Sequence, residues 1–215
     1  MNIVYRDDAI VVAEKPRGVL SEGSDPRGMP ALLGAVLGAP VLTVHRLDRE
    51  TAGLMVFARD GKTAGLLSAA MQAGHFLKEY AAVVHGVPDP PAGEMCDLLF
   101  RDAKRGKSFI VDRPRHGVRE ARLTYRTEAT AKGADGAPLS LVSVRLGTGR
   151  THQIRVQFSG RGMPLYGDGR YGGRERAPLG LFARRLAFPH PGDGRELSFF
   201  LPLPHEEAYA YFQNE

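Results

Sequence analysis

The amino-acid sequence predicts an α+β fold: a single domain with a mixed, mostly antiparallel central sheet flanked by helices and loops. Short runs rich in β-branched and aromatic residues recur between glycine- and proline-containing turns, and only a few segments show helical spacing. No repeat period or low-complexity linker divides the chain. With 43% hydrophobic and 25% charged residues, the 215 residues suit one globular domain over positions 1–215.

Strands are predicted wherever an apolar run lies between turn residues. At the start of the chain, the acidic pair Asp7-Asp8 is typical of a turn between strands at residues 3–5 and 9–13. Residues 133–136 (GADG) likewise predict the turn of an antiparallel hairpin. The further strands are predicted at residues 53–58, 79–85, 108–111, 121–127, 139–146, 180–188 and 196–201.

Helices are predicted from capping residues and apolar spacing. Asp60 is a suitable N-cap for a helix that Gly74 ends, and Gly38 ends a shorter one. In the third predicted helix, Ile154 and Phe158 share one face, which leaves a charged face for a site. The four helices are predicted at residues 30–37, 60–74, 151–159 and 205–212.

Positive charge is concentrated in two segments of the chain. Residues 101–126 carry nine Lys or Arg against three Asp or Glu, and residues 149–185 carry eight against two. Because the whole chain has a net charge of only +5, the remainder is acidic. Clustered cations suit a phosphate backbone, so nucleic acid is the first partner to consider. The alternative is compositional bias, since 23 of the 29 basic residues are Arg, as a GC-rich genome would produce.

Several classes of protein are excluded by what the sequence lacks. No apolar run approaches the roughly 18 residues of a membrane helix. Asp7 and Asp8 stand where a secretion signal would be basic and then apolar, so we expect a cytoplasmic protein. The single cysteine, Cys96, cannot form an internal disulfide, and the seven histidines show no H-E-x-x-H pattern. We therefore expect no membrane association, no metal and no other cofactor.

Three glycine patterns resemble nucleotide-binding loops but lack a required feature. Residues 61–63 and 106–108 look like the end of a phosphate-binding loop, yet Val56 and Arg101 occupy the position of its first glycine. Residues 167–172 match G-x-G-x-x-G but follow no buried strand and precede no helix, which predicts a flexible turn. There is no G-x-S-x-G elbow, so a serine hydrolase of the α/β type is disfavoured.

Two polar segments carry candidate chemistry. Residues 44–54 (VHRLDRETAGL) place two arginines and two acids immediately before a predicted strand. Residues 147–156 (GTGRTHQIRV) crowd hydrogen-bond donors around a predicted helix start. Alone, the first is also typical of a solvated turn with local salt bridges, and the second of a basic helix start.

Together, H-R-L-D-x-x-T-x-G-L and G-R-T-H-Q-I-R-V about a hundred residues later resemble the RluA-type family of RNA pseudouridine synthases. Residues 3–20 resemble that family's opening strand pair with its Lys-Pro-x-Gly turn. Residues 76–86 resemble its K-x-Y-x-A-x-V-x-G strand, and residues 164–172 resemble its P-x-x-G-D-x-x-Y-G loop. The resemblance spans essentially the whole chain and implies the pseudouridine synthase fold.

The resemblance implies isomerisation of uridine to pseudouridine in RNA. The glycosidic bond breaks at N1, the uracil turns over, and it is rejoined through C5. Since a stacked base hides its sugar carbons, the nucleotide must be flipped out of the RNA. Arg46 is implied to fill the vacated place, because a planar guanidinium both stacks and bonds phosphates.

The resemblance makes Asp48 the catalytic residue. An ionised carboxylate could attack C1′ or remove a proton from C2′, and the sequence does not choose between these. Arg155 is implied to orient that carboxylate, and Tyr80 to stack on the flipped uracil and assist loss of the C5 proton. His45 and His152 are not the catalysts in this family, so we assign them to RNA contact.

RNA contact is predicted for Arg46, His45, Lys78, Arg150, His152, Gln153, Lys104, Arg105 and Lys107. The last three, with Arg113 and Arg115, are interpreted as a mobile basic arm, although simple solvation would explain them equally.

The sequence departs from the family pattern at Ala52, Gln157 and Phe182, which affects substrate contacts rather than the proposed catalytic residue. Because the chain begins with the implied catalytic strands, we expect no separate N-terminal RNA-binding module. The expected partner is a stem-loop of tRNA or ribosomal RNA, bound by a monomer. The alternative is a non-catalytic RNA-binding or RNA-folding protein on the same scaffold; a nuclease would need clustered carboxylates that are absent here.

Overall fold

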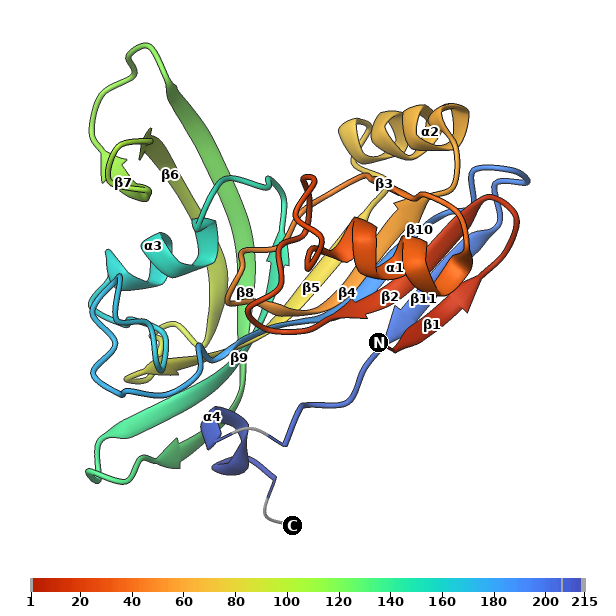
Figure 1. The fold of residues 1–215 in the computed structure, drawn as a ribbon. Coiled ribbons are helices and arrows are strands. Elements are labelled where there is room, and N and C mark those ends of the chain that lie inside the picture. Colours follow the sequence, from red (N-terminus) through yellow and green to blue (C-terminus); the bar gives the residue numbers. More distant parts are fainter. Residues whose placement is uncertain (1, 206, 214–215) are drawn as a thin grey trace. The chain divides into compact units, whose positions relative to one another are not determined.

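The computed structural model describes residues 2–205 and 207–213 (Figure 1). These residues form two compact units. The first comprises the described residues up to Lys78 together with Phe182–Pro202, and the second comprises Glu79–Leu181 together with the described residues from Leu203 onward. Both units combine strands with helices, and the predicted α+β class is confirmed.

The first unit is a mixed sheet. The antiparallel β1–β2 hairpin, at the red end of the chain in Figure 1, pairs through β2 with β4. β3 also pairs with β4, antiparallel. β10 runs parallel to β4 through Phe182 and Ala183 and antiparallel to β11. The strands are β1 (Ile3–Arg6), β2 (Ile10–Lys15), β3 (Leu42–Thr43), β4 (Ala52–Ala58), β10 (Leu181–Pro189) and β11 (Glu196–Phe200).

Both faces of this sheet are covered. Every residue of β4 is buried, as the uninterrupted apolar run AGLMVFA predicts. Alternate residues of β2, β4 and β10 form one apolar cluster, which Leu67 of α2 (Gly61–Gln72) joins. α2 begins as predicted, with the Asp60 carboxylate accepting a hydrogen bond from the Thr63 amide at 2.8 Å. α1 (Met29–Leu37) ends at Gly38, whose φ of 67° suits glycine.

The second unit is an antiparallel sheet in the order β5-β9-β8-β6-β7. Val118, Ala121 and Leu123 in the first half of β8 are buried. The helix α3 packs on β6 and β7. The strands are β5 (Leu77–His85), β6 (Ala92–Asp102), β7 (Lys107–Val111), β8 (Val118–Lys132) and β9 (Pro138–Leu146).

The helices of the second unit are shorter than predicted. α3 spans Gln153–Ser159, and α4 spans only Glu207–Ala210, where Tyr209 is fully buried and donates a hydrogen bond to the Ala81 carbonyl at 3.1 Å. The charged face of α3, predicted to be available for a site, is not open to solvent, because all residues from Gln153 to Phe158 are buried. The polar side chains of this helix therefore lie in the interior of the second unit.

Two strands were not predicted. β6 contains Gly93, Glu94 and Asp97, residue types that disfavour strands, and it forms because both of its edges pair, with β8 and with β7. β3 is only two residues long. The other predicted strands and the hairpin turn at residues 133–136 are confirmed, with shifts of a few residues at their ends.

None of the helices in the described ranges is long and apolar enough to cross a bilayer. Within the same residues, no three His, Cys, Asp or Glu side chains are grouped so as to hold a metal ion.

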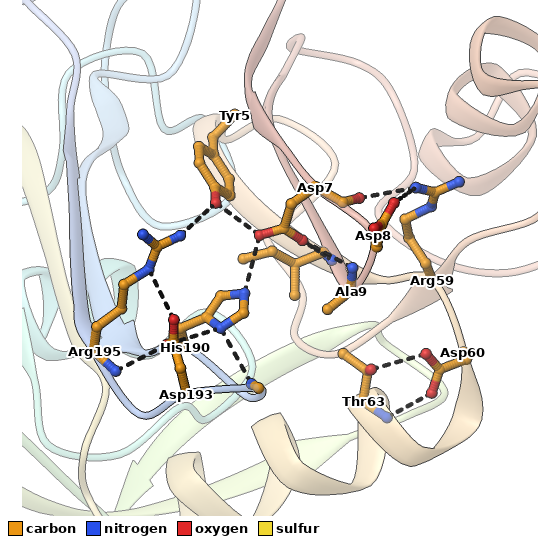
Figure 2. A network of polar contacts seen from close by, with 12 residues as sticks. Tyr5, Asp7, Asp8, Ala9, Arg59, Asp60, Thr63, His190, Asp193 and Arg195 are labelled. Atoms are coloured by element: carbon orange, nitrogen blue, oxygen red, sulfur yellow. Dashed lines mark hydrogen bonds and ion pairs between the residues drawn. The ribbon is translucent and has the colours of Figure 1, made fainter.

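A polar network in the first unit centres on Asp7, in the β1–β2 turn (Figure 2). Its carboxylate accepts hydrogen bonds from the Tyr5 hydroxyl at 2.7 Å, from the amides of Ala9 and Ile10 at 2.8 Å, and from His190 Nε2 at 2.9 Å. Partial burial raises the pKa of Asp7, but these hydrogen bonds outweigh it and lower the pKa to about 2. Since His190 directly follows β10, the network ties this turn to the β10–β11 hairpin.

We expect Asp7→Asn to lower the free energy of unfolding by about 2 kcal/mol at pH 7, from the difference between a folded pKa of about 2 and the ordinary value of 3.8. Because the folded pKa is the lower one, this contribution is present above about pH 4 and disappears as the pH falls towards 2. Urea denaturation at several pH values measures it. Asp8→Asn, at an exposed neighbour paired only loosely with Arg59 at 3.8 Å, should change little. A pH-independent difference between Asp7→Asn and wild type would contradict the assignment.

Candidate active site

A buried lysine holds the turn that carries Asp48. Lys15, at the end of β2, is 0% exposed. Its ammonium donates hydrogen bonds to the carbonyls of Pro16, Val19 and Arg49 at 2.9, 2.7 and 3.0 Å. The three donor hydrogens of a lysine are thereby matched by three backbone acceptors. Lys15 therefore joins the turn after β2 to the backbone directly after Asp48.

Backbone contacts fix the same turn from both sides. The Thr51 amide donates to the Asp48 carbonyl at 3.0 Å, which closes the turn. Gly18 and Arg49 make a reciprocal pair: the Gly18 amide donates to the Arg49 carbonyl at 2.8 Å, and Arg49 Nε donates to the Gly18 carbonyl at 2.9 Å. The side chain of Asp48 itself is half-buried. A carboxylate is thus presented on a rigid turn without being enclosed.

Burial disfavours the charged form of Lys15. Burial lowers the pKa of Lys15 to about 8, while the charges of Glu50 and Asp48 oppose that shift. At pH 7 the ammonium is therefore still predominantly protonated, which its three carbonyl acceptors require.

The Ser21 hydroxyl brings Glu22 and Arg46 together by bonding the backbone of Leu47. Ser21 Oγ donates to the Leu47 carbonyl at 2.7 Å and accepts from the Leu47 amide at 3.0 Å. Beside this contact, Arg46 Nη1 lies 2.9 Å from Glu22 Oε1, and both side chains are about half exposed, at 53% and 52%. Arg46 therefore faces outward, in an ion pair with Glu22 that was not predicted.

The side chain of His45, unlike that of Arg46, faces β4. The Val56 amide of β4 donates to His45 Nε2 at 3.1 Å, and Nδ1 is buried with no hydrogen-bond partner among the described residues. Burial and the nearby charge of Lys78 lower the pKa of His45 to about 3, so the imidazole is neutral. In the free protein His45 anchors its segment to β4. Its enclosed nitrogens do not favour the RNA contact predicted for it.

The glycine of the first motif segment is required by a close approach of two strands. Gly53 has φ of 120°, and a Cβ there would lie 2.3 Å from the carbonyl oxygen of Ala183 on β10. Only glycine allows the parallel pairing of β4 with β10 at this point.

In the second unit, Gln153 organises the second motif segment. Its Oε1 accepts from the Thr148 hydroxyl at 2.8 Å and from the Arg150 amide at 3.0 Å, and its Nε2 donates to the Arg122 carbonyl of β8 at 2.9 Å. The side chain is 3% exposed. RNA contact is predicted for Gln153, but in the structure its side chain is buried and bonds groups of the protein itself. Arg150, by contrast, is exposed, and its Nε donates a hydrogen bond to the Glu120 carbonyl at 2.8 Å.

Arg155 forms a buried ion pair that the sequence analysis missed. Its Nε and Nη2 each donate to the Asp168 carboxylate at 2.7 Å, and the two side chains are 8% and 0% exposed. A bidentate pair of this kind fixes the plane of the guanidinium. The sequence does single out Asp168, because it is the aspartate of the P-x-x-G-D loop pattern.

Tyr171 links this pair to β7. Its hydroxyl accepts from the Ser108 amide at 2.8 Å and lies 2.9 Å from His152 Nδ1. The cations of Lys107 and Arg155 lie 4.8 and 5.2 Å from the centre of its ring. His152 adopts a left-handed backbone conformation with φ of 56°, which is uncommon outside glycine and typical of functional sites. Three separate segments of the second unit thus meet at one aromatic ring.

Three residues of the predicted basic arm lie in the β6–β7 hairpin: Lys104 and Arg105 are in its turn, and Lys107 begins β7. Arg113 and Arg115 follow β7 and are exposed. Arg170 Nη1 donates to the Gly106 carbonyl at 2.7 Å at the tip of the hairpin. Lys104 and Arg105 are exposed there, whereas Lys107 is half-buried against Tyr171. Lys104 and Arg105 therefore remain suited to phosphate contact, and Lys107 has a structural role as well.

The predicted catalytic residues are distributed over both units. Asp48 belongs to the first unit, and Tyr80 and Arg155 belong to the second. Tyr80 lies on β5 and is 7% exposed. Lys78, on the same strand, belongs to the first unit, and burial lowers its pKa.

Comparison with known proteins defines the family. A family model described as RNA pseudouridylate synthase matches residues 9–160, and this chain belongs to that family. Its members isomerise uridine in RNA to pseudouridine, and the chain is accordingly an RNA-modifying isomerase. The predicted resemblance is confirmed.

The chain is 33% identical to the ribosomal large subunit pseudouridine synthase D of Vibrio cholerae, over 96% of this chain and 68% of that protein. It is 36% identical to an uncharacterised RNA pseudouridine synthase of Mycobacterium bovis, over 98% of this chain and 71% of the relative. Among solved structures, human RNA pseudouridylate synthase domain containing 1 is similar with a TM-score of 0.80 and 25% identity, over 94% of this chain and 83% of that one.

We expect Asp168→Asn to lower the free energy of unfolding by about 3–5 kcal/mol, because it leaves the Arg155 guanidinium buried without its counter-charge. Guanidinium chloride denaturation measures the loss. Asp97→Asn is the matched control, since Asp97 pairs with Arg161 at 2.9 Å but Arg161 is 34% exposed. That control should cost about 1 kcal/mol. Equal losses in the two variants would contradict a special role for the Asp168 pair.

Proposed function

We propose that this protein isomerises a specific uridine in ribosomal RNA, with Asp48 as the catalytic carboxylate. Family membership supplies the reaction. The choice of ribosomal RNA over tRNA is supported by relatives in Vibrio cholerae and Pseudomonas aeruginosa that are named ribosomal large subunit pseudouridine synthase D, each 33% identical to this chain. The expectations of a monomer and of a cytoplasmic location belong to the same proposal.

The observation that carries the proposal is the rigid presentation of Asp48. Lys15, Gly18 and Thr51 fix the backbone on both sides of it, while its side chain remains half-buried. A purely structural acid would be enclosed with its partners, and a purely solvating acid would need no such support. A fixed carboxylate lowers the cost of reaching a reactive arrangement, because its orientation is settled before the substrate binds.

The chemistry needs one carboxylate and one route for a proton. The C1′–N1 bond of uridine breaks and a C1′–C5 bond forms, while the C5 proton leaves and N1 gains one, so that the product is an isomer of the substrate. The Asp48 carboxylate either attacks C1′ or removes a proton from C2′. Both routes require it to be ionised and directed at the ribose.

Arg155 and Tyr80 are assigned the supporting roles. We assign to Arg155 the orientation of the Asp48 carboxylate, for which its bidentate pair with Asp168 supplies a fixed guanidinium plane. Tyr80 stacks on the flipped uracil and assists removal of the C5 proton. In the same proposal, Arg46 fills the gap left in the RNA, and Lys104, Arg105 and Arg150 contact phosphates.

We expect Asp48→Asn to reduce turnover at least about a thousandfold, because the amide can neither attack C1′ nor accept the proton. Turnover is measured as tritium released from ribosomal RNA transcribed with [5-³H]uridine. Binding of the same RNA should change little. Near-normal release by Asp48→Asn would refute the catalytic assignment, and no release by wild type from any RNA would refute the activity.

Glu50→Gln is the matched control for this experiment. Glu50 is an exposed acid two residues further along the same turn, so its replacement also removes one negative charge beside Lys15. Its turnover should stay within about threefold of wild type, which would separate the chemical role of Asp48 from a general effect of charge.

A further inference from the structure

The ion pair between Glu22 and Arg46 lies beside a hydrogen-bonded contact between the Ser21 hydroxyl and the Leu47 backbone. The reciprocal hydrogen bonds of Ser21 with Leu47, at 2.7 and 3.0 Å, bind two segments that are 26 residues apart in the chain. Ser21 is 4% exposed and Leu47 is 5% exposed, so this contact is shielded from water. The Ser21 carbonyl also accepts from the Thr43 hydroxyl at 3.2 Å. Glu22 and Arg46 are the exposed neighbours of this contact, and the Glu22 carboxylate lies beside the Arg46 guanidinium.

Stability does not explain this arrangement. Both side chains are about half exposed, and exposed ion pairs contribute little to folding. A carboxylate is also an unfavourable neighbour for a residue that meets RNA, since it repels phosphate. The Ser21–Leu47 contact nevertheless holds the two segments together, and Glu22 Oε1 lies 2.9 Å from Arg46 Nη1. We therefore look for the effect of Glu22 in the binding of RNA by Arg46.

We propose that Glu22 is a specificity-determining residue, which keeps Arg46 from binding RNA backbones indiscriminately. The inference rests on the proposed function, in which Arg46 enters the gap left by the flipped nucleotide. A phosphate that approaches Arg46 must compete with a carboxylate that is already in place. A non-substrate RNA offers Arg46 its phosphates but no gap in a base stack. A substrate also offers stacking for the guanidinium plane, and this additional contact lets it displace Glu22.

The test compares Glu22→Gln with wild type in binding a fluorescein-labelled single-stranded oligouridylate, measured by fluorescence anisotropy at several salt concentrations. We expect Glu22→Gln to bind it about three- to tenfold more tightly at low salt, with a salt slope steeper by about 0.7, the change for one added phosphate contact. Glu22→Asp, which keeps the charge on a shorter side chain, should lie between the two. Unchanged affinity and slope in Glu22→Gln would overturn the proposal.

Two controls separate this effect from a change in net charge. Asp8→Asn removes one exposed negative charge from the same unit and should leave binding close to that of wild type. In an Arg46→Met background, Glu22→Gln should have no further effect, because Glu22 acts through Arg46. An equal gain from Asp8→Asn, or a full gain in the Arg46→Met background, would overturn the proposal.

Turnover gives an independent readout. With tritium-labelled ribosomal RNA as substrate, unlabelled oligouridylate should inhibit Glu22→Gln at a lower concentration than wild type. If wild type releases no tritium from any RNA, the proposed function fails, and the binding comparison still decides whether Glu22 restrains Arg46.

Discussion

The burial of the Arg155 guanidinium against the Asp168 carboxylate is the constraint on which the candidate site of the second unit depends. With side chains 8% and 0% exposed, neither charge could be accommodated without the other. The pair therefore fixes α3, which carries Arg155, against the loop that carries Asp168. Tyr171 extends the arrangement to β7 through the Ser108 amide.

The first unit uses a buried cation for the same purpose, with a different kind of partner. Lys15 is matched by three backbone carbonyls rather than by a carboxylate. A carbonyl carries no charge to neutralise, and so the lowered pKa of Lys15 reflects the burial that the arrangement costs. In return, the ammonium positions two turns that apolar packing could not hold, because turns expose backbone polar groups. Polar contacts thus position both motif segments, and the apolar core lies beneath them.

The elements that could be predicted are those encoded locally. The Asp7-Asp8 turn, the Asp60 cap and the buried run of β4 each follow from neighbouring residues. β6 could not be predicted in this way, since its stability comes from pairing on both edges with strands distant in sequence. The same applies at the site. The motif residues could be found from the sequence, but the partner of Arg155 and the burial of Gln153 depend on loops whose paths sequence spacing does not reveal.

The segment His45 to Asp48 shows how a short motif combines anchoring with chemistry. Its residues alternate in direction: His45 bonds the Val56 amide and Leu47 is 5% exposed, whereas Arg46 is outward and Asp48 is half-buried. Two anchored residues thus restrict the direction of Arg46, which lies between them, and of Asp48, which follows them. A neutral His45 is essential to this arrangement, since a charged imidazole could not accept the Val56 hydrogen bond. The histidine of the motif is therefore explained by the geometry it imposes on Arg46 and Asp48, and needs no share in proton transfer.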